Sequence, residues 1–168
     1  MTKTLPYSID PNFVLILERV IDVPREWVWK AWTNPEQVMQ WIAPAPWETV
    51  GCDIDLKPGG GFMITMRAPD GKEFPTVGCF LDVVPYERLV WTPVLGPGYR
   101  PSAARQTGAD LPFTGVIQLE SRGSATKYTA IAIHRDEDDR RTHAEMGFHQ
   151  SWGKALDQLV AMAKRDTR

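Results

Sequence analysis

The alternation of apolar and polar residues predicts a chain built mainly of strands. Residues 13–22 (FVLILERVID) are rich in β-branched and large apolar side chains, as is typical of a strand. In residues 47–56 (WETVGCDIDL), Val50, Cys52 and Ile54 alternate with polar neighbours, which is the period of a half-buried strand. Further strands are predicted at residues 61–68, 75–84, 88–94, 112–120 and 125–134.

Apolar residues at helical spacing predict two short helices after the first strand and one long helix at the end. Pro24 suits the first turn of a helix, and Asn34 can cap a second helix that begins at Pro35. The last helix, over residues 139–164, would span ~39 Å at ~1.5 Å per residue. This order predicts an α+β fold, in which an antiparallel sheet of about seven strands is covered on one face by the long helix.

Length and charge narrow the class of protein. A chain of 168 residues predicts one domain, which we expect over residues 12–165 behind a flexible leader at 1–11. The net charge of −2 gives no general attraction to nucleic acid or to anionic membranes. The chain has no run of 18 apolar residues and no apolar signal segment at its start, so we expect a cytoplasmic protein without a membrane span.

Four segments carry a resemblance to a known family. They are VPREWVWKAWTNPEQVMQWIAP (23–44), WETVGCDIDLKPGGGF (47–62), FPTVGCFLDVVPYERLVWT (74–92) and MGFHQSWGKALDQL (146–159). In this order they resemble the single-domain proteins that are similar to the C-terminal domain of the activator of Hsp90 ATPase. That family belongs to the START-like, birch-pollen-allergen-like superfamily (SRPBCC). The resemblance covers roughly residues 13–163.

The resemblance implies a helix-grip fold, in which a curved antiparallel sheet wraps around the C-terminal helix, usually with a cavity between them. A chaperone partner is less expected than a small ligand, because the eukaryotic namesake binds its chaperone partly through an additional N-terminal domain. No cofactor is expected, and a homodimer is left open.

The predicted final helix places two polar residues among apolar ones. On a helical wheel, Trp152, Leu156 and Leu159 lie on the inward face, Glu145 lies near its centre and His149 flanks it. Glu145 and His149 are four residues apart and could form a buried structural pair. Alternatively, they line the polar end of a cavity, where a histidine beside a carboxylate could also act as an acid or a base.

The tryptophans are the other candidates for a site. Seven tryptophans in 168 residues are many, and they either fill the core or form the walls of a cavity for a flat or lipophilic ligand. The predicted ligand-binding set is Trp32, Trp41, Met66, Phe80, Trp91, Phe113, Glu145, His149 and Trp152. No metal site is predicted, because the three histidines do not have ligand spacing on one face.

Three functions remain open at this point. The first is a protein that binds a small hydrophobic molecule, with the Gly- and Pro-rich loop at 95–112 either gating the cavity or forming a surface insertion. The second is a cyclase or dehydratase with Glu145 and His149 as catalytic residues. The third is a regulator of a chaperone ATPase, which predicts a large exposed apolar patch.

Overall fold

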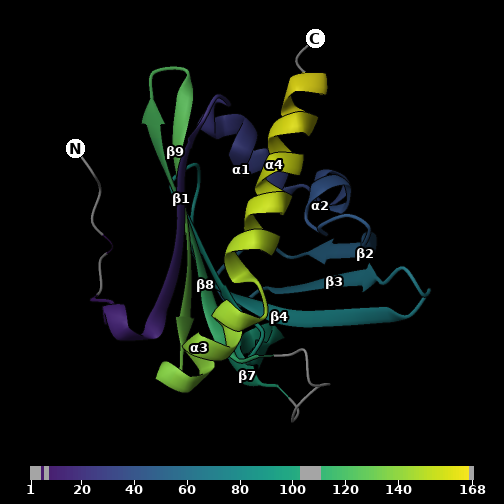
Figure 1. Cartoon of the computed structure of the whole chain (residues 1–168), viewed down its shortest axis with the longest axis vertical. Coiled ribbons are helices and arrows are strands. Elements are labelled where there is room, and N and C mark those ends of the chain that lie inside the picture. Colours follow the sequence, from purple (N-terminus) through teal and green to yellow (C-terminus); the bar gives the residue numbers. More distant parts are fainter. Residues whose placement is uncertain (1–4, 6–7, 103–110, 167–168) are drawn as a thin grey trace.

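The structure is a computed structural model that describes residues 5, 8–102 and 111–166. A strongly bent antiparallel sheet faces one long helix, α4, as Figure 1 shows. Strands β1, β8 and β9 run alongside α4, whereas β2, β3 and β4 run across its direction. This confirms the predicted α+β arrangement, because the sheet and the helix bury their apolar faces against one another.

The main sheet has seven strands in the order β1-β9-β8-β5-β4-β3-β2, and all neighbours are antiparallel. The first and last strands of the chain therefore pair, and β1 and β2 form the two edges of the sheet. The strands are β1 (Val14–Ile21), β2 (Glu48–Ile54), β3 (Gly61–Arg67), β4 (Glu73–Val84), β5 (Arg88–Thr92), β8 (Phe113–Arg122) and β9 (Ala125–His134). A second, small sheet pairs β6 (Leu95–Gly96) with β7 (Arg100–Pro101).

Two short helices follow β1, as predicted. They are α1 (Arg25–Thr33) and α2 (Pro35–Trp41). The side chain of Asn34 accepts hydrogen bonds from the backbone N–H groups of Glu36 and Gln37 at 3.0 and 3.3 Å, so it caps α2 as expected. Single 3-10 turns lie at Pro11–Phe13 and Pro97–Tyr99.

The predicted single C-terminal helix is in fact two helices, α3 (Glu137–Glu145) and α4 (Phe148–Asp166). The chain between them contains Gly147, whose φ of 92° lies in the left-handed region that ends helices and that favours glycine. Figure 1 shows α3 turned away from the axis of α4 at the lower end of the sheet. The long helix is therefore shorter than predicted, and a helical wheel cannot be continued from α4 back into α3.

Helix α4 carries the apolar stripe of the main core. Leu156 and Leu159 are fully buried, and they pack with residues of β1, β8, β9 and α1 in one cluster. Gly153 lets α4 lie close to the side chain of Arg19 on β1, because a Cβ at this position would lie 2.7 Å from Nη2 of Arg19. Arg19 crosses over Gly153 and donates a hydrogen bond from Nη1 to Oδ1 of Asp157 at 2.6 Å.

The opposite face of the sheet has a smaller apolar cluster. Val14, Val90, Val116 and Ile131 form its buried part. Leu5 and Ile9 from the predicted leader pack against this cluster, together with Leu81 and Ile133. No helix among the described residues is long and apolar enough to cross a membrane.

Candidate functional site

A pocket of about 610 Å³ lies between α4 and the sheet. Its lining comes from α1, α2 and α4 and from the six strands other than β1 in the main sheet. The described lining residues are Trp32, Val38, Trp41, Ile42, Pro44, Ile54, Phe62, Ile64, Met66, Thr76, Phe80, Leu89, Trp91, Pro93, Val94, Ser102, Leu111, Pro112, Phe113, Tyr128, Ser151, Trp152 and Ala155. A volume of this size and an apolar lining are typical of small-molecule sites.

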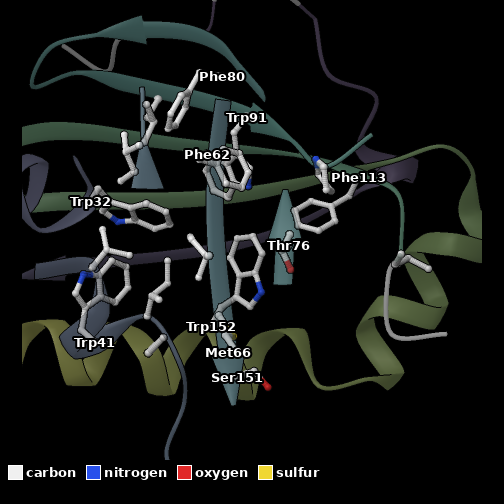
Figure 2. A pocket seen from close by; sticks show the side chains of 18 of the residues that line it. Trp32, Trp41, Phe62, Met66, Thr76, Phe80, Trp91, Phe113, Ser151 and Trp152 are labelled. Carbon is white, nitrogen blue, oxygen red and sulfur yellow. The ribbon is translucent and has the colours of Figure 1, made fainter. Parts of the chain in front are cut away.

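Aromatic rings follow one another along the pocket. The ring of Trp32 lies 5.0 Å from that of Trp41 and 5.2 Å from that of Trp91, measured between ring centroids. Trp91 stacks on Trp152 at 6.4 Å, and Trp152 lies 5.9 Å from Phe113. Figure 2 shows Trp32 and Trp41 on one side of the pocket, Phe113 on the other, and Trp152 rising from α4 between them. A ligand in this space would meet the faces and edges of large rings over most of its surface.

Two glycines in the sheet make room for rings of the pocket wall. Trp91 on β5 is paired in register with Gly115 on β8, and Phe62 on β3 is paired with Gly78 on β4. A Cβ at Gly115 would lie 2.4 Å from the ring of Trp91, and a Cβ at Gly78 would lie 2.3 Å from the ring of Phe62. The rings can therefore lie against the backbone of the neighbouring strand, which keeps the space above them open.

The polar groups of the lining are few and uncharged. They are the hydroxyls of Thr76, Ser102, Tyr128 and Ser151, together with indole N–H groups. Tyr128, on β9, is only 3% exposed, and its hydroxyl oxygen accepts a hydrogen bond from Nε1 of Trp32 at 3.1 Å. Burial raises the pKa of Tyr128 well above its usual value, so that the phenol stays protonated.

The structure brings most of the predicted site residues to this pocket. Trp32, Trp41, Met66, Phe80, Trp91, Phe113 and Trp152 all line it. They come from α1, α2, β3, β4, β5, β8 and α4, so segments that are far apart in the sequence meet at one place. That these seven residues bind a ligand stays a prediction.

The predicted position of Glu145 and His149 is wrong. Both residues are exposed and neither lines the pocket. Nε2 of His149 lies 3.2 Å from the carbonyl oxygen of Ile16 on β1, away from the pocket lining. The break at Gly147 explains the error for Glu145, because it changes the rotational phase between α3 and α4 and brings Phe148 into the core at 1% exposure. His149 lies within α4, beside its apolar stripe, and its ring turns toward β1 instead of the pocket.

The buried polar residue of α3 is His143, which the sequence did not single out for this role. Its Nδ1 lies 2.8 Å from Nε2 of His134 on β9, and Nδ1 of His134 lies 2.9 Å from the carbonyl oxygen of Phe13. The ring of His143 also lies 5.2 Å from that of Phe113 and 6.1 Å from that of Trp152. The pair His134–His143 therefore packs against two rings of the pocket wall. Burial, and to a lesser degree the charge of His134, lowers the pKa of His143 to about 4.

Tyr128 was also missed as a lining residue. The sequence held a signal, because Tyr128, Ala130, Ala132 and His134 occupy alternate positions of one strand and so share one face. The structure buries all four. This alternation places Tyr128 on the same face as the residues that meet α4.

The loop at 95–112, for which gating and a surface insertion were the two alternatives, is described only in part. Residues 103–110 lie outside the described residues. Ser102, Leu111 and Pro112, on either side of them, line the pocket. Within the described parts of the chain, no group of three or more His, Cys, Asp or Glu side chains could hold a metal ion.

Fold and pocket together define the class of protein. A seven-stranded antiparallel sheet with two short helices after its first strand faces a long C-terminal helix, and a large apolar pocket lies between them. The family model described as activator of Hsp90 ATPase homolog 1-like protein matches residues 22–164. The chain therefore belongs to this family, as the resemblance indicated.

Solved structures agree with this assignment. The chain is 40% identical to protein NE0264 from Nitrosomonas europaea, with a TM-score of 0.88 over 95% of this chain and 99% of that one. The AHSA1-like protein from Aeromonas hydrophila is 22% identical, with a TM-score of 0.66 over 92% of this chain and 94% of that one. A protein from Rhodobacter sphaeroides is 18% identical, with a TM-score of 0.77 over 94% and 97% of the two chains, respectively. The last two likenesses show the fold alone, and no curated protein matches the chain.

Proposed function

We propose that this protein binds a small, mostly apolar molecule in the pocket between α4 and the sheet. The observation that carries the proposal is the lining itself. It encloses about 610 Å³ with tryptophan, phenylalanine and aliphatic side chains and, among the described residues, contains no charged side chain. Removing an apolar ligand from water into such a space is favourable in proportion to the area that it buries.

Diphenylhexatriene tests the proposal, because this hydrocarbon becomes fluorescent in apolar surroundings. Ala155 lies on α4 at 7% exposure and lines the pocket, so Ala155→Phe adds a ring to the space that a ligand needs. Ala161 lies on the exposed side of the same helix, which makes Ala161→Phe the matched control. We expect saturable binding to the wild type, at least about tenfold weaker binding to Ala155→Phe, and unchanged binding to Ala161→Phe.

Circular dichroism of both variants shows whether each one folds. The proposal is wrong if the probe does not bind the wild type, or if a folded Ala155→Phe variant binds it as well as the Ala161→Phe variant does. Equal binding would place the probe somewhere other than the pocket.

The two other functions have less support. A cyclase or dehydratase required Glu145 and His149 to reach one bound substrate, and neither residue lines the pocket. The role as a regulator of a chaperone ATPase stays a prediction. We further propose a cytoplasmic location, which the two free cysteines support, since Cys79 is fully buried as a core residue and neither thiol is in a disulfide.

A further inference from the structure

The phenol of Tyr128 is a buried hydrogen-bond donor for which the described residues supply no acceptor. Its oxygen accepts the N–H of Trp32 at 3.1 Å. A hydroxyl can donate one hydrogen bond as well as accept, and buried polar groups nearly always find their partners. No described residue accepts a hydrogen bond from this phenol, although the side chain is 3% exposed and lines the pocket. The free O–H is therefore available to a molecule inside the pocket.

The donor remains an O–H across the physiological range. Burial in apolar surroundings disfavours the phenolate, and the bond from Trp32 and the charge of Arg19 only partly offset this effect. Trp32 can only donate through its indole nitrogen, so it occupies an acceptor position of the phenol oxygen and leaves the phenol hydrogen to point elsewhere. The pair thus presents a fixed, uncharged donor.

The surroundings of Tyr128 do not favour an anion. The described lining has no lysine, arginine or histidine that could pair with a carboxylate or a phosphate. Arg19, the cation that acts on Tyr128, is already bound to Asp157 at 2.6 Å and does not line the pocket. Burying a charged group without a partner costs far more than burying a neutral acceptor that receives one hydrogen bond.

We propose that the ligand is a neutral ring compound with a hydrogen-bond-accepting oxygen, such as a ketone, and that Tyr128 donates its phenolic hydrogen to that oxygen. This inference rests on the proposed function and specifies its ligand class. The ring system lies against the tryptophans, and the oxygen lies at the Trp32–Tyr128 pair. Tyr128 thereby determines specificity between ligands of almost the same shape.

Three compounds of nearly equal shape test the inference by displacement of diphenylhexatriene. Fluorene has no acceptor, fluorenone adds one neutral carbonyl oxygen, and fluorene carboxylate adds a negative charge. We expect fluorenone to bind the wild type about tenfold more tightly than fluorene, since a net hydrogen bond in a buried site gives a factor of this order. Fluorene carboxylate is expected to bind more weakly than fluorene.

Two variants then test whether the preference for fluorenone over fluorene depends on the hydroxyl group of Tyr128. Tyr128→Phe keeps the ring and removes the hydroxyl, so the preference for fluorenone over fluorene is expected to fall to within about twofold, mainly through weaker binding of fluorenone. Tyr86→Phe is the matched control, because it removes the same hydroxyl from a tyrosine that is 45% exposed and does not line the pocket, and it is expected to retain the preference. Displacement constants are corrected for the probe affinity of each variant.

The outcomes separate this inference from the proposed function. If the probe and fluorene bind but fluorenone has no advantage, or if fluorene carboxylate binds as tightly as fluorenone, the inference is overturned while the proposed function stands. A preference that survives in Tyr128→Phe would also overturn it. If neither the probe nor any of the three compounds binds the wild type, the proposed function itself fails. The wild-type series decides the ligand class even if a variant does not fold.

Discussion

At the scale of single residues, the hydrogen bonds of the buried pair His134–His143 determine which ring nitrogens carry a proton. The carbonyl oxygen of Phe13 can only accept, so Nδ1 of His134 donates to it and, in the neutral ring, Nε2 of His134 accepts. Nδ1 of His143 must then be the donor in the 2.8 Å contact between the rings. A proton added to His143 would enter at Nε2, within a cluster that includes Phe113, Phe148 and Trp152.

This arrangement predicts how stability depends on pH. The pKa of His143 is about 4 in the folded protein and 6.5 in an ordinary environment, so the unfolded chain binds the proton more tightly. The free energy of unfolding therefore falls as pH is lowered from about 6.5 toward 4, and His143 alone accounts for about 2 kcal/mol between pH 7.5 and pH 5. Well above pH 6.5 it contributes no pH dependence, because the histidine is then neutral in both the folded and the unfolded chain. Urea unfolding at the two pH values measures the difference.

His143→Asn identifies the source of that dependence. The asparagine amide can still donate to Nε2 of His134 but cannot titrate, so this variant is expected to lose most of the difference between the two pH values. His149→Asn is the matched control, because His149 is exposed, and it is expected to behave like the wild type. An unchanged pH dependence in His143→Asn would contradict the assignment.

At the scale of elements, the strands and the two short helices could be predicted because each carries its own local signal. Phe62, Ile64 and Met66 alternate on β3 and all line the pocket, and Asn34 with Pro35 marks the start of α2. The break before α4 could not be placed in the same way. Gly147 sits within a pattern that otherwise suits a helix, and whether glycine interrupts a helix depends on what the flanking turns pack against.

The kind of side chain explains why part of the site was predicted and part was not. Large apolar side chains are driven inward whatever the exact phase of their element, so Trp32, Trp91 and Trp152 could be assigned to the interior from the sequence. Glu145 had been placed by an angle that was measured across Gly147, and His149 by an angle that put it at the border of the inward face. A polar candidate therefore needs a correct element boundary, whereas an aromatic candidate does not.

The pairing of β5 with β8 leads to a prediction about the pocket wall. Gly115→Ala would place a Cβ about 2.4 Å from the ring of Trp91, so the ring must move off the strand and toward the open space. We expect a loss of about 1–3 kcal/mol in the free energy of unfolding and weaker binding of diphenylhexatriene. Urea unfolding and probe titration measure the two effects.

Gly51→Ala on β2 serves as the control for this substitution. The nearest side-chain atoms to a Cβ at Gly51, those of Thr65, lie at 3.6 and 3.7 Å, which is ordinary contact. This variant is expected to keep both the stability and the binding of the wild type within small changes. If Gly115→Ala also keeps both, Trp91 does not need the glycine to stay in the wall.

At the scale of the whole molecule, the bend of the sheet creates the space for a site. Helix α4 packs closely on β1, α1 and α2, while β2, β3 and β4 run across its direction (Figure 1). This arrangement leaves a volume of about 610 Å³. Most of the lining side chains could be ranked as apolar from the sequence, but the volume arises from the relative placement of distant elements. The residue patterns left a cavity as one of two alternatives. The expectation of a curved sheet with a cavity beneath the helix came from the family resemblance, because local patterns do not encode the curvature of a sheet.

The concentration of indoles in this wall gives the protein a spectroscopic property of its own. Four of the seven tryptophans, Trp32, Trp41, Trp91 and Trp152, border the same space. Indole emission responds to polarity and to quenching groups at short range, so these four indoles are placed to sense a ligand in the pocket. Ligand binding should therefore change the intrinsic tryptophan fluorescence of the unlabelled protein. A ketone quenches indoles on contact, so it should lower the emission more than a hydrocarbon of the same shape does.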